Sequence, residues 1–164
     1  MPGRDLLDYT QAFNNGRYYE PPVSLKGLHR SLNASPHHSS GIYVKRNILT
    51  TTLLQSLPTT GGFIERNKKK LSPLQFEQLA LDSVLLNNAY VRRIESRTGS
   101  LHSWEVLPAM YTRKMIKGNN RYCYIEKLNN IIEYEEDEVF HLYSRDAAQE
   151  IYGLPEYMSG LQSA

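Results

Sequence analysis

The residue types that most often perform chemistry are sparse in this chain of 164 residues. Its single cysteine, Cys123, could pair with His141, because an imidazole that takes the thiol proton creates a nucleophile. Cys123 stands between Tyr122 and Tyr124 in a predicted strand, however, where a cysteine packed in a sheet is the simpler interpretation. The chain also lacks a phosphate-binding loop, a dinucleotide-binding glycine motif and a nucleophile elbow. We therefore expect no catalytic residue and no enzymatic activity.

The adjacent residues His37 and His38 are the most suggestive of a metal site. Neighbouring residues of a helix point about 100° apart, so two of them rarely bind one ion. A zinc site needs further ligands at workable spacing, whereas His29, His102 and His141 are scattered. We expect His37 and His38 in the first turn of a helix, with local hydrogen bonds. We predict neither a metal site nor a cofactor.

The charges are unevenly distributed, although the net charge of +2 is too small to indicate nucleic-acid binding by itself. Basic clusters occur at 66–70, 92–93 and 113–117, and an acidic run occupies 133–138. The simplest interpretation of each is a solvated face, and the acidic run reads as a solvated turn and not as a magnesium site. The alternative is a two-sided particle, with basic residues toward a polyanion and acidic residues toward a basic neighbour.

A basic loop supplies the candidates for nucleic-acid contact. Residues 56–71 read as a loop, because Pro58, Gly61 and Gly62 break any periodicity. The candidates that follow in this loop are Lys68, Lys69 and Lys70. A small basic nucleic-acid-binding module is accordingly the alternative function that the residues themselves allow.

The termini and the cysteine content bear on the compartment. A single cysteine excludes an intrachain disulfide and fits a reducing compartment. The N-terminus lacks the apolar core of a signal peptide, and no run approaches the roughly 20 apolar residues that cross a bilayer. We expect a soluble, intracellular protein without a membrane segment.

Three helices are predicted in the first half of the chain, after an extended segment at 1–23. The first follows an N-cap at Ser24 and carries a one-sided apolar stripe. The second begins at Ser35-Pro36, and the threonines at 50–52 are expected to weaken its end. The third begins at a capping box, Ser72 to Gln75, and is apolar around its circumference, which is typical of a buried helix. The apolar positions of the first two helices are Leu25, Leu28 and Leu32, and then Ile42, Ile48, Leu49 and Leu53.

Short strands are predicted from Tyr90 onward. Two of them flank the turn 97–100, two flank Asn129-Asn130, and a further strand covers 138–144. This order, helices first and then an antiparallel meander, indicates an α+β fold with a curled sheet or a small, partly closed barrel.

The last residues begin a further helix. Pro155 suits a first helical turn, and Tyr157, Met158 and Leu161 form a stripe at helical spacing. We expect this helix to need a partner for its apolar side. The twelve tyrosines suggest either ordinary core edges or large contact surfaces, since tyrosine is enriched at interfaces. Those beside element boundaries are Tyr18, Tyr19, Tyr43, Tyr90, Tyr152 and Tyr157.

Several stretches together resemble the N-terminal part of portal proteins of tailed bacteriophages, of the PBSX type. They run in that family's order and cover most of the chain, and "QEIYGLPEY" is the most specific part. The stretches are "YYEPPVSLKGLHRSL" (18–32), "SPHHSSGIYVKRNIL" (35–49), "LALDSVLLNNAYVRR" (79–93), "VLPAMYTRK" (106–114) and "VFHLYSRDAAQEIYGLPEYMSGLQSA" (139–164).

The resemblance implies a structural role in a ring of subunits, usually twelve, at one vertex of the capsid. Such rings take part in head assembly and pass DNA through a central channel without reading its sequence. The implied partners are the other subunits, the major capsid or scaffold protein, the terminase motor and head-completion proteins.

The resemblance also implies a wing-like domain at 24–164, with helices at 24–88, an SH3-like small barrel of strands at 89–144 and the start of a helix at 155–164. In that family the chain continues into further regions, so we expect this chain to be a front portion, in the host cytoplasm during assembly and then in the virion.

Overall fold

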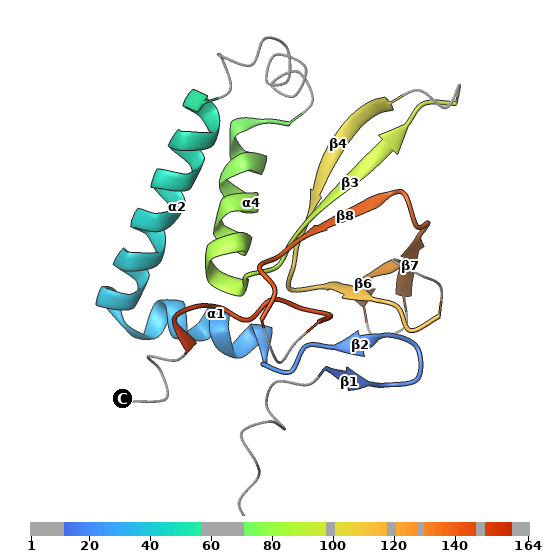
Figure 1. Cartoon of the computed structure of the whole chain (residues 1–164), viewed down its shortest axis with the longest axis horizontal. Coiled ribbons are helices and arrows are strands. Elements are labelled where there is room, and N and C mark those ends of the chain that lie inside the picture. The colour runs from blue at the N-terminus through green and yellow to red at the C-terminus, as the bar shows by residue number, and fades with distance from the viewer. Residues whose placement is uncertain are drawn as a thin grey trace, which may run out of the picture.

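The computed structural model describes residues 12–56, 71–97, 101–117, 121–127, 130–146 and 150–158. Figure 1 shows the helices on one side of the molecule and the strands on the other. The helices are α1 (Leu25–Ala34), α2 (Pro36–Ser56) and α4 (Pro73–Leu86). The strands are β1 (Phe13–Asn14), β2 (Tyr19–Glu20), β3 (Ala89–Glu95), β4 (Leu101–Leu107), β5 (Thr112–Lys114), β6 (Tyr122–Lys127), β7 (Asn130–Tyr134) and β8 (Val139–Leu142).

The first and third predicted helices are confirmed with their caps. The Ser24 hydroxyl accepts a hydrogen bond from the Gly27 N–H at 3.1 Å, and the leucine stripe of α1 is buried. At α4, the Gln75 N–H donates to the Ser72 hydroxyl, and the Gln75 side chain accepts from the Ser72 N–H. This reciprocal pair satisfies two donors that a helix start otherwise leaves open. The local sequence therefore sets the beginning of α4.

Helix α2 departs from the prediction in two respects. The helix runs on to Ser56, through the threonines that were expected to weaken its end, and Thr50 is buried, whereas sequence reasoning gave the packing positions to the apolar residues. Ile48, expected on the packing side, is 61% exposed, whereas Ile42 is buried. Six positions along a helix rotate a side chain by about 240°, so both isoleucines cannot face α4. Helix α2 thus turns apolar residues both inward and outward.

The strands form two three-stranded antiparallel sheets, ordered β4-β3-β8 and β5-β6-β7. Sheet β4-β3-β8 lies between the helices and the second sheet (Figure 1). On one side, Phe76 of α4 packs with Val106 of β4. On the other side, the ring of Tyr90 meets the ring of Tyr122 on β6, with centroids 5.7 Å apart. The main core fills the space among α1, α4 and the two sheets.

The α+β class is confirmed, but the strand order differs from a simple meander. Strand β8 returns to pair with β3, in the register Ala89↔Leu142 to Arg92↔Val139, and not with its chain neighbour β7. The strands from β3 to β8 form two separate sheets and not a closed barrel. Strand β5, which sequence patterns did not predict, consists of three residues paired with β6.

The segment before α1 forms the small hairpin β1-β2, which lies against β5. Tyr18 makes an isolated antiparallel bridge with Met115, and the Ile116 N–H donates to the Arg17 carbonyl at 3.2 Å. Residues 17 and 18 of the segment predicted as extended therefore pair with residues 115 and 116. Within the described residues, no helix combines the length and apolar character needed to cross a membrane.

Candidate functional site

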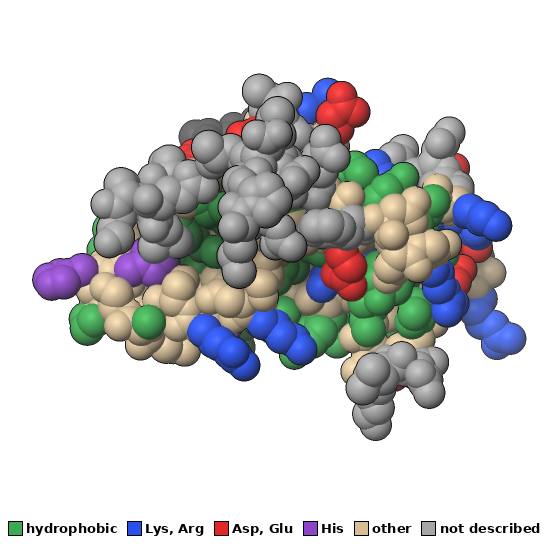
Figure 2. Space-filling model, turned by 90° about the horizontal axis from the view of Figure 1, so that it is seen from below, with side chains coloured by type: hydrophobic (Ala, Val, Ile, Leu, Met, Phe, Trp, Pro, Cys, Tyr) green, Lys and Arg blue, Asp and Glu red, His purple; other side chains and the backbone are tan. Residues whose placement is uncertain are grey.

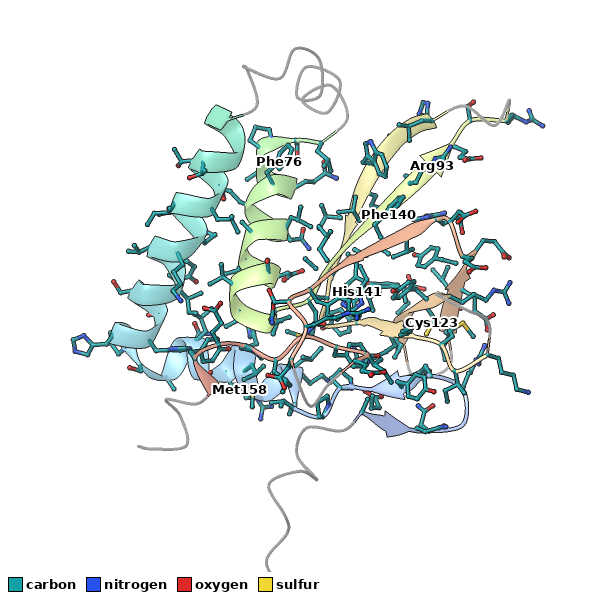
Figure 3. The ribbon with its side chains drawn as sticks, viewed as in Figure 1. Phe76, Arg93, Cys123, Phe140, His141 and Met158 are labelled. Atoms are coloured by element: carbon teal, nitrogen blue, oxygen red, sulfur yellow. The ribbon has the colours of Figure 1, made fainter. Side chains whose placement is uncertain are left out.

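Cys123 lies on β6 as expected and has no exposed surface. Burial raises the pKa of its thiol to about 11, so the thiolate needed for nucleophilic attack is scarce at neutral pH. Figure 3 shows Cys123 and His141 on different strands. The prediction of a packed cysteine is confirmed.

His141 lies in the interior on β8 and is held there by rings and by one amide. Its imidazole stacks on Tyr90 and on Tyr143, with centroids 4.3 and 4.4 Å away. Its Nε2 atom lies 2.9 Å from the Oδ1 atom of Asn88. Since that oxygen accepts, His141 carries the proton on Nε2. Burial lowers the pKa of His141 to about 3, so the ring is neutral at physiological pH.

His37 and His38 lie in the first turn of α2, as predicted, but local hydrogen bonding is recorded only for the His38 backbone, and the buried His38 Nε2 has no hydrogen-bond partner among the described residues. The His38 N–H donates to the Ser35 hydroxyl at 3.4 Å. The rings of His38 and Tyr157 pack edge to face, with their centroids 4.7 Å apart. Among the described residues, no group of histidines, cysteines and carboxylates is arranged to hold a metal ion.

The acidic run is more strongly paired than a solvated turn would be. Glu133 on β7 bonds Arg17 at 2.8 Å, and Glu135 bonds Arg121 at 2.9 Å. Glu138 lies 3.6 Å from the guanidinium of Arg92. The turn prediction is confirmed at 136–138, but the run also ties the strands to neighbouring arginines. Glu136 and Asp137 at its tip are exposed.

Two asparagines after α4 hold Ser144, Gly153 and Leu154 against the protein. Asn87 is the left-handed C-cap of α4, with φ 49°, a conformation that asparagine tolerates well. Its side-chain amide donates to the Ser144 and Leu154 carbonyls at 3.2 and 2.8 Å. Its side-chain oxygen accepts from the Ser144 N–H at 3.1 Å. One side chain therefore joins the helix end to two later points of the chain.

Asn88 completes this arrangement in the interior. Its amide donates to the Leu86 and Gly153 carbonyls at 2.7 and 2.9 Å. Its oxygen accepts from the Gly153 N–H at 2.9 Å, beside the bond to His141. Gly153 is required here, because a Cβ atom would stand 2.1 Å from the Asn87 carbonyl oxygen. We call Asn87, Asn88 and Gly153 the asparagine clasp.

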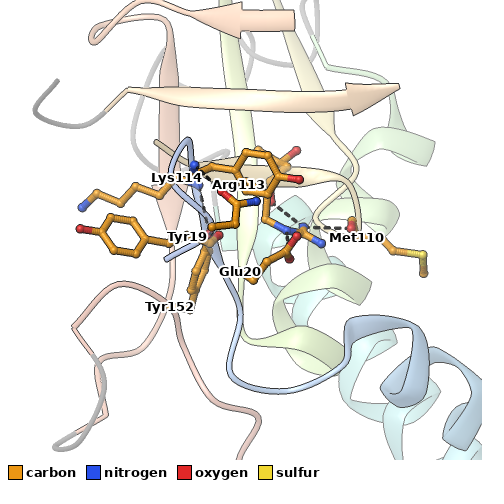
Figure 4. A network of polar contacts seen from close by, with 9 residues as sticks. Tyr19, Glu20, Met110, Arg113, Lys114 and Tyr152 are labelled. Atoms are coloured by element: carbon orange, nitrogen blue, oxygen red, sulfur yellow. Dashed lines mark hydrogen bonds and ion pairs between the residues drawn. The ribbon is translucent and has the colours of Figure 1, made fainter. Parts of the chain in front are cut away.

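A tyrosine next to the clasp extends it to the hairpin β1-β2. The Tyr152 hydroxyl donates to the Tyr19 carbonyl and accepts from the Lys114 N–H at 3.0 Å (Figure 4). Beside it, Arg113 bonds the Glu20 carboxylate at 2.9 Å. The C-terminal segment, β5 and the first hairpin thus form one polar junction.

The tyrosines that we singled out are therefore largely internal. Tyr90 and Tyr152 are each 1% exposed, and the Tyr157 hydroxyl donates to the Leu85 carbonyl at 2.6 Å. Tyr43, by contrast, lies on α2 and is 38% exposed. Core packing explains most of this set.

A cavity of about 370 Å³ opens between α2, the end of α4 and the residues Ser144, Glu156 and Tyr157. Apolar Ile42 and Val84 line it together with Lys45 and Glu156, whose charged atoms lie 3.5 Å apart.

Exposed apolar side chains lie together on α2 and on β8, and others are exposed at Leu74, Tyr111 and Ile132. The α2 face consists of Tyr43, Val44 and Ile48, which are 38, 54 and 61% exposed. The β8 face consists of Phe140 and Leu142, which are 48 and 49% exposed, with Phe140 tilted against Trp104 at 5.7 Å. Figure 2 shows the underside, where hydrophobic side chains reach the surface between lysines and arginines. Apolar side chains left outside the core are typical of contact surfaces.

Some predicted features lie outside the described residues. These are Lys68, Lys69 and Lys70, the candidates for nucleic-acid contact, and Leu161 of the last predicted stripe. The Met158 N–H donates to the Pro155 carbonyl at 3.1 Å, so a helical turn does begin at Pro155. Sequence reasoning missed the asparagine clasp. The signal for it was Asn-Asn directly after an apolar helix, since asparagine is a common left-handed cap.

The curated relatives of this chain include two probable portal proteins of phages. The probable portal protein of Escherichia phage P2 is 42% identical over 161 residues, which are 98% of this chain and 43% of that protein. The probable portal protein of Haemophilus phage HP1 is 23% identical over 164 residues, 96% of this chain and 44% of that protein. The chain thus spans less than half the length of the curated relatives it matches. No family model matches it.

Solved structures share the fold. A chain from the virion of a native gene transfer agent particle superposes with a TM-score of 0.72 at 14% identity, covering 92% of this chain and 43% of that one. A chain from the neck of the native particle, computed with C12 symmetry, gives a TM-score of 0.70 at 13% identity, covering 94% and 43%.

Proposed function

Since this chain is homologous to phage portal proteins over nearly its whole length, we propose that it is part of a structural subunit of a portal ring. In this role, copies of the subunit form a ring at one capsid vertex, take part in head assembly and surround the DNA as it passes. The chain works in the virion and, before that, in the host cytoplasm during assembly. Its contribution is mechanical and not enzymatic.

The observation that carries the proposal is the 42% identity over 161 residues with the portal protein of phage P2. Identity of this extent over a whole domain is typical of a shared role as well as a shared fold. Chains from the neck and the virion of gene transfer agent particles have the same fold, which agrees with this proposal. At 13 to 14% identity these structures indicate a common fold and not a common function.

The internal chemistry of the described residues agrees with a mechanical role. The two groups that could have formed a catalytic pair are both in their neutral forms, because burial raises the pKa of Cys123 to about 11 and lowers that of His141 to about 3. The polar residues of the interior are used to fasten segments together, as in the asparagine clasp. A subunit of a ring that carries load needs this kind of rigidity.

The partners follow from the resemblance. They are the neighbouring subunits, the capsid or scaffold protein, the terminase motor and the head-completion proteins. Contact with DNA in this role is through the phosphate backbone and independent of sequence. Lys68, Lys69 and Lys70 remain the candidates for such a contact within this chain.

Electron microscopy tests the proposal. The complete gene product that carries this chain is purified and imaged in negative stain and in vitreous ice. Rings with a central channel are the expected result, and a population of compact monomers without rings at any concentration would reject the proposal.

A measurement of DNA binding separates the alternative, a basic nucleic-acid-binding module. For a ring subunit we expect weak, sequence-independent binding. A free-standing module would instead bind DNA tightly as a monomer; because salt weakens phosphate contacts in both cases, the affinity and the oligomeric state of the bound species decide between them.

A further inference from the structure

Another cavity, of about 510 Å³, lies between α1, the second half of α4 and the turn that follows β4. We call it the α1 cavity. Its apolar wall belongs to the core, since Leu85 and Leu86 of α4 are each 2% exposed. Leu81 and Met110 add partly buried apolar surface beside them. A concave and largely apolar surface of this size is typical of a binding site.

Three basic residues of α1 line the same cavity. Lys26, His29 and Arg30 are spaced three and four positions apart, so they stand on one side of the helix. All three are exposed, and none of them makes an ion pair within the part of the chain that the structure describes. Six other basic residues are each paired with a carboxylate, namely Arg17, Lys45, Arg92, Arg93, Arg113 and Arg121.

The sequence around α1 supplies no negative charge to balance these side chains. No acidic residue occurs between Glu20 and Glu65, a stretch that includes the whole of α1 and α2. Glu20 itself is bonded to Arg113 at 2.9 Å. The exposed side of the α1 cavity therefore favours a ligand that carries negative charge.

One carboxylate, that of Asp82 on α4, lines the cavity and narrows the choice of ligand. Its Oδ2 atom accepts a hydrogen bond from the Ala109 N–H at 3.1 Å, and its Oδ1 atom has no partner among the described residues. The phosphate backbone of DNA would meet this like charge and has no donor for it. A peptide has backbone N–H groups that can donate to such an oxygen, and apolar side chains that suit the wall of the cavity.

We propose that the α1 cavity binds a segment of a partner protein in which apolar side chains lie between carboxylates. The apolar side chains pack against Leu85 and Met110, and the carboxylates bond to Lys26 and Arg30, whose guanidinium offers two parallel donors. The same two cations disfavour a basic segment. The inference goes beyond the proposed function, since it concerns one copy of this chain and does not depend on ring closure.

Fluorescence anisotropy tests the contact. The probe is a labelled synthetic peptide with two central leucines between runs of glutamate, titrated with the complete gene product that carries this chain. We expect saturable binding. The same peptide with serines in place of the leucines should bind about tenfold more weakly, because the wall of the cavity is apolar. A peptide with lysines in place of the glutamates should not bind. Absence of binding by the first peptide, or equal binding by all three, would overturn the inference.

Charge reversal on α1 shows whether the peptide binds at this cavity. Arg30→Glu should weaken binding of the acidic peptide by about tenfold, because it places a like charge beside the bound carboxylates. Lys117→Glu is the matched control, since Lys117 is also exposed, lies outside the cavity and gives the same change in net charge. Equal losses with the two variants would show that net charge alone attracts the peptide, which would reject the site.

Asp82→Asn separates the classes of ligand. The asparagine oxygen still accepts a hydrogen bond, whereas the negative charge is removed. The acidic peptide should therefore bind as well as before or more tightly, and a loss of binding would reject the proposed sign of the ligand charge. A labelled single strand of thymidines is titrated in parallel. If it binds more tightly than the peptide and is weakened by Arg30→Glu alone, the cavity takes nucleic acid and the proposal of a peptide is wrong.

The outcomes separate this inference from the proposed function. Rings seen by microscopy without binding of the acidic peptide would reject the contact and leave the portal role standing. Binding that is sensitive to Arg30→Glu in a protein that forms no rings would support the contact and reject the portal role.

Discussion

Helix α2 and the asparagine clasp lie on either side of one cavity. The clasp buries polar side chains, whereas α2 exposes apolar ones. In the clasp, buried amides find every partner inside the protein, and Asn88 is only 2% exposed. On α2, Val44 and Ile48 are more than half exposed and find no apolar partner in the core. The comparison teaches that stability is concentrated around residues 87–88 and 153, while the outer side of α2 leaves apolar side chains exposed to solvent.

Gly153→Ala should produce the largest loss on the side of the clasp. The added Cβ atom would stand 2.1 Å from the Asn87 carbonyl oxygen, so the backbone must move and the bonds to Asn88 must lengthen. We expect a loss of about 3 kcal/mol in the free energy of unfolding, measured by urea denaturation. Gly41→Ala on α2 is the matched control, because nothing lies within 4 Å of its added Cβ. Equal urea midpoints for the two variants would break the comparison.

Asn88→Ala should rank second. It leaves the Gly153 N–H and carbonyl and the His141 ring without a buried partner. We expect a loss of about 2 to 3 kcal/mol, from the desolvation cost of the unpaired groups. Asn47→Ala, at an exposed position of α2, should change the free energy of unfolding by less than about 0.5 kcal/mol. A similar effect at both positions would contradict the contrast.

The pH dependence of stability should report on His141. Its pKa is about 3 in the folded protein and 6.5 in the unfolded chain, so the unfolded state binds more protons between these values. Stability should therefore fall as the pH falls below 6.5, by up to about 1.4 kcal/mol per pH unit. Asp82 has the opposite sign, because burial raises its pKa from 3.8 to about 6 and the folded state then binds more protons.

An Asp82→Asn background removes that opposing titration. In it, the slope between about pH 4 and 6 should become steeper, and adding His141→Gln should flatten it again. Thermal or urea unfolding across this range measures both slopes. Identical slopes with and without His141→Gln would show that the imidazole is not held in a desolvated, neutral state.

Tyr152→Phe should have a smaller effect. It removes the hydroxyl that joins the Tyr19 carbonyl to the Lys114 N–H, while the ring stays in place. We expect a loss of about 1 to 2 kcal/mol. Tyr43→Phe on α2 serves as the control and should be close to neutral. A protease-sensitivity assay of the first hairpin would sharpen the result, since Tyr152 fastens that hairpin.

Ile48→Ser should have the smallest effect on stability. The side chain is 61% exposed, so its removal changes the free energy of unfolding of a single copy by less than about 0.5 kcal/mol. Urea unfolding at dilution measures this. A loss as large as that of Asn88→Ala would mean that Ile48 belongs to the core, and the distinction between the two regions would fall.

The sequence predicted the elements of this fold better than their arrangement. The capping box at Ser72 and the leucine stripe of α1 are local signals, and both were confirmed. The pairing of β8 with β3 depends on contacts between distant residues, which periodicity does not encode. Strand β5 is only three residues long and has too little pattern to detect.

The candidate site was less predictable for a related reason. Ile48 was assigned to the packing side because an apolar residue at helical spacing usually packs inward. Its outward position is set by which neighbours cover α2, and that is a tertiary fact. The clasp was missed because the role of Asn87 and Asn88 depends on Gly153, which lies 65 residues from Asn88. Lys68, Lys69 and Lys70 lie outside the described residues and remain candidates from sequence alone.

The return of β8 to β3 also bears on how the protein is made. The side chain of Asn87 bonds Ser144, 57 residues later, so sheet β4-β3-β8 is incomplete until that part of the chain has left the ribosome. Until then the growing chain presents the open edge of β3, which is a template for pairing with other strands. Contacts between such distant residues also slow folding. Nascent chains should therefore pass through an interval in which aggregation competes with folding, and that interval ends when β8 is added.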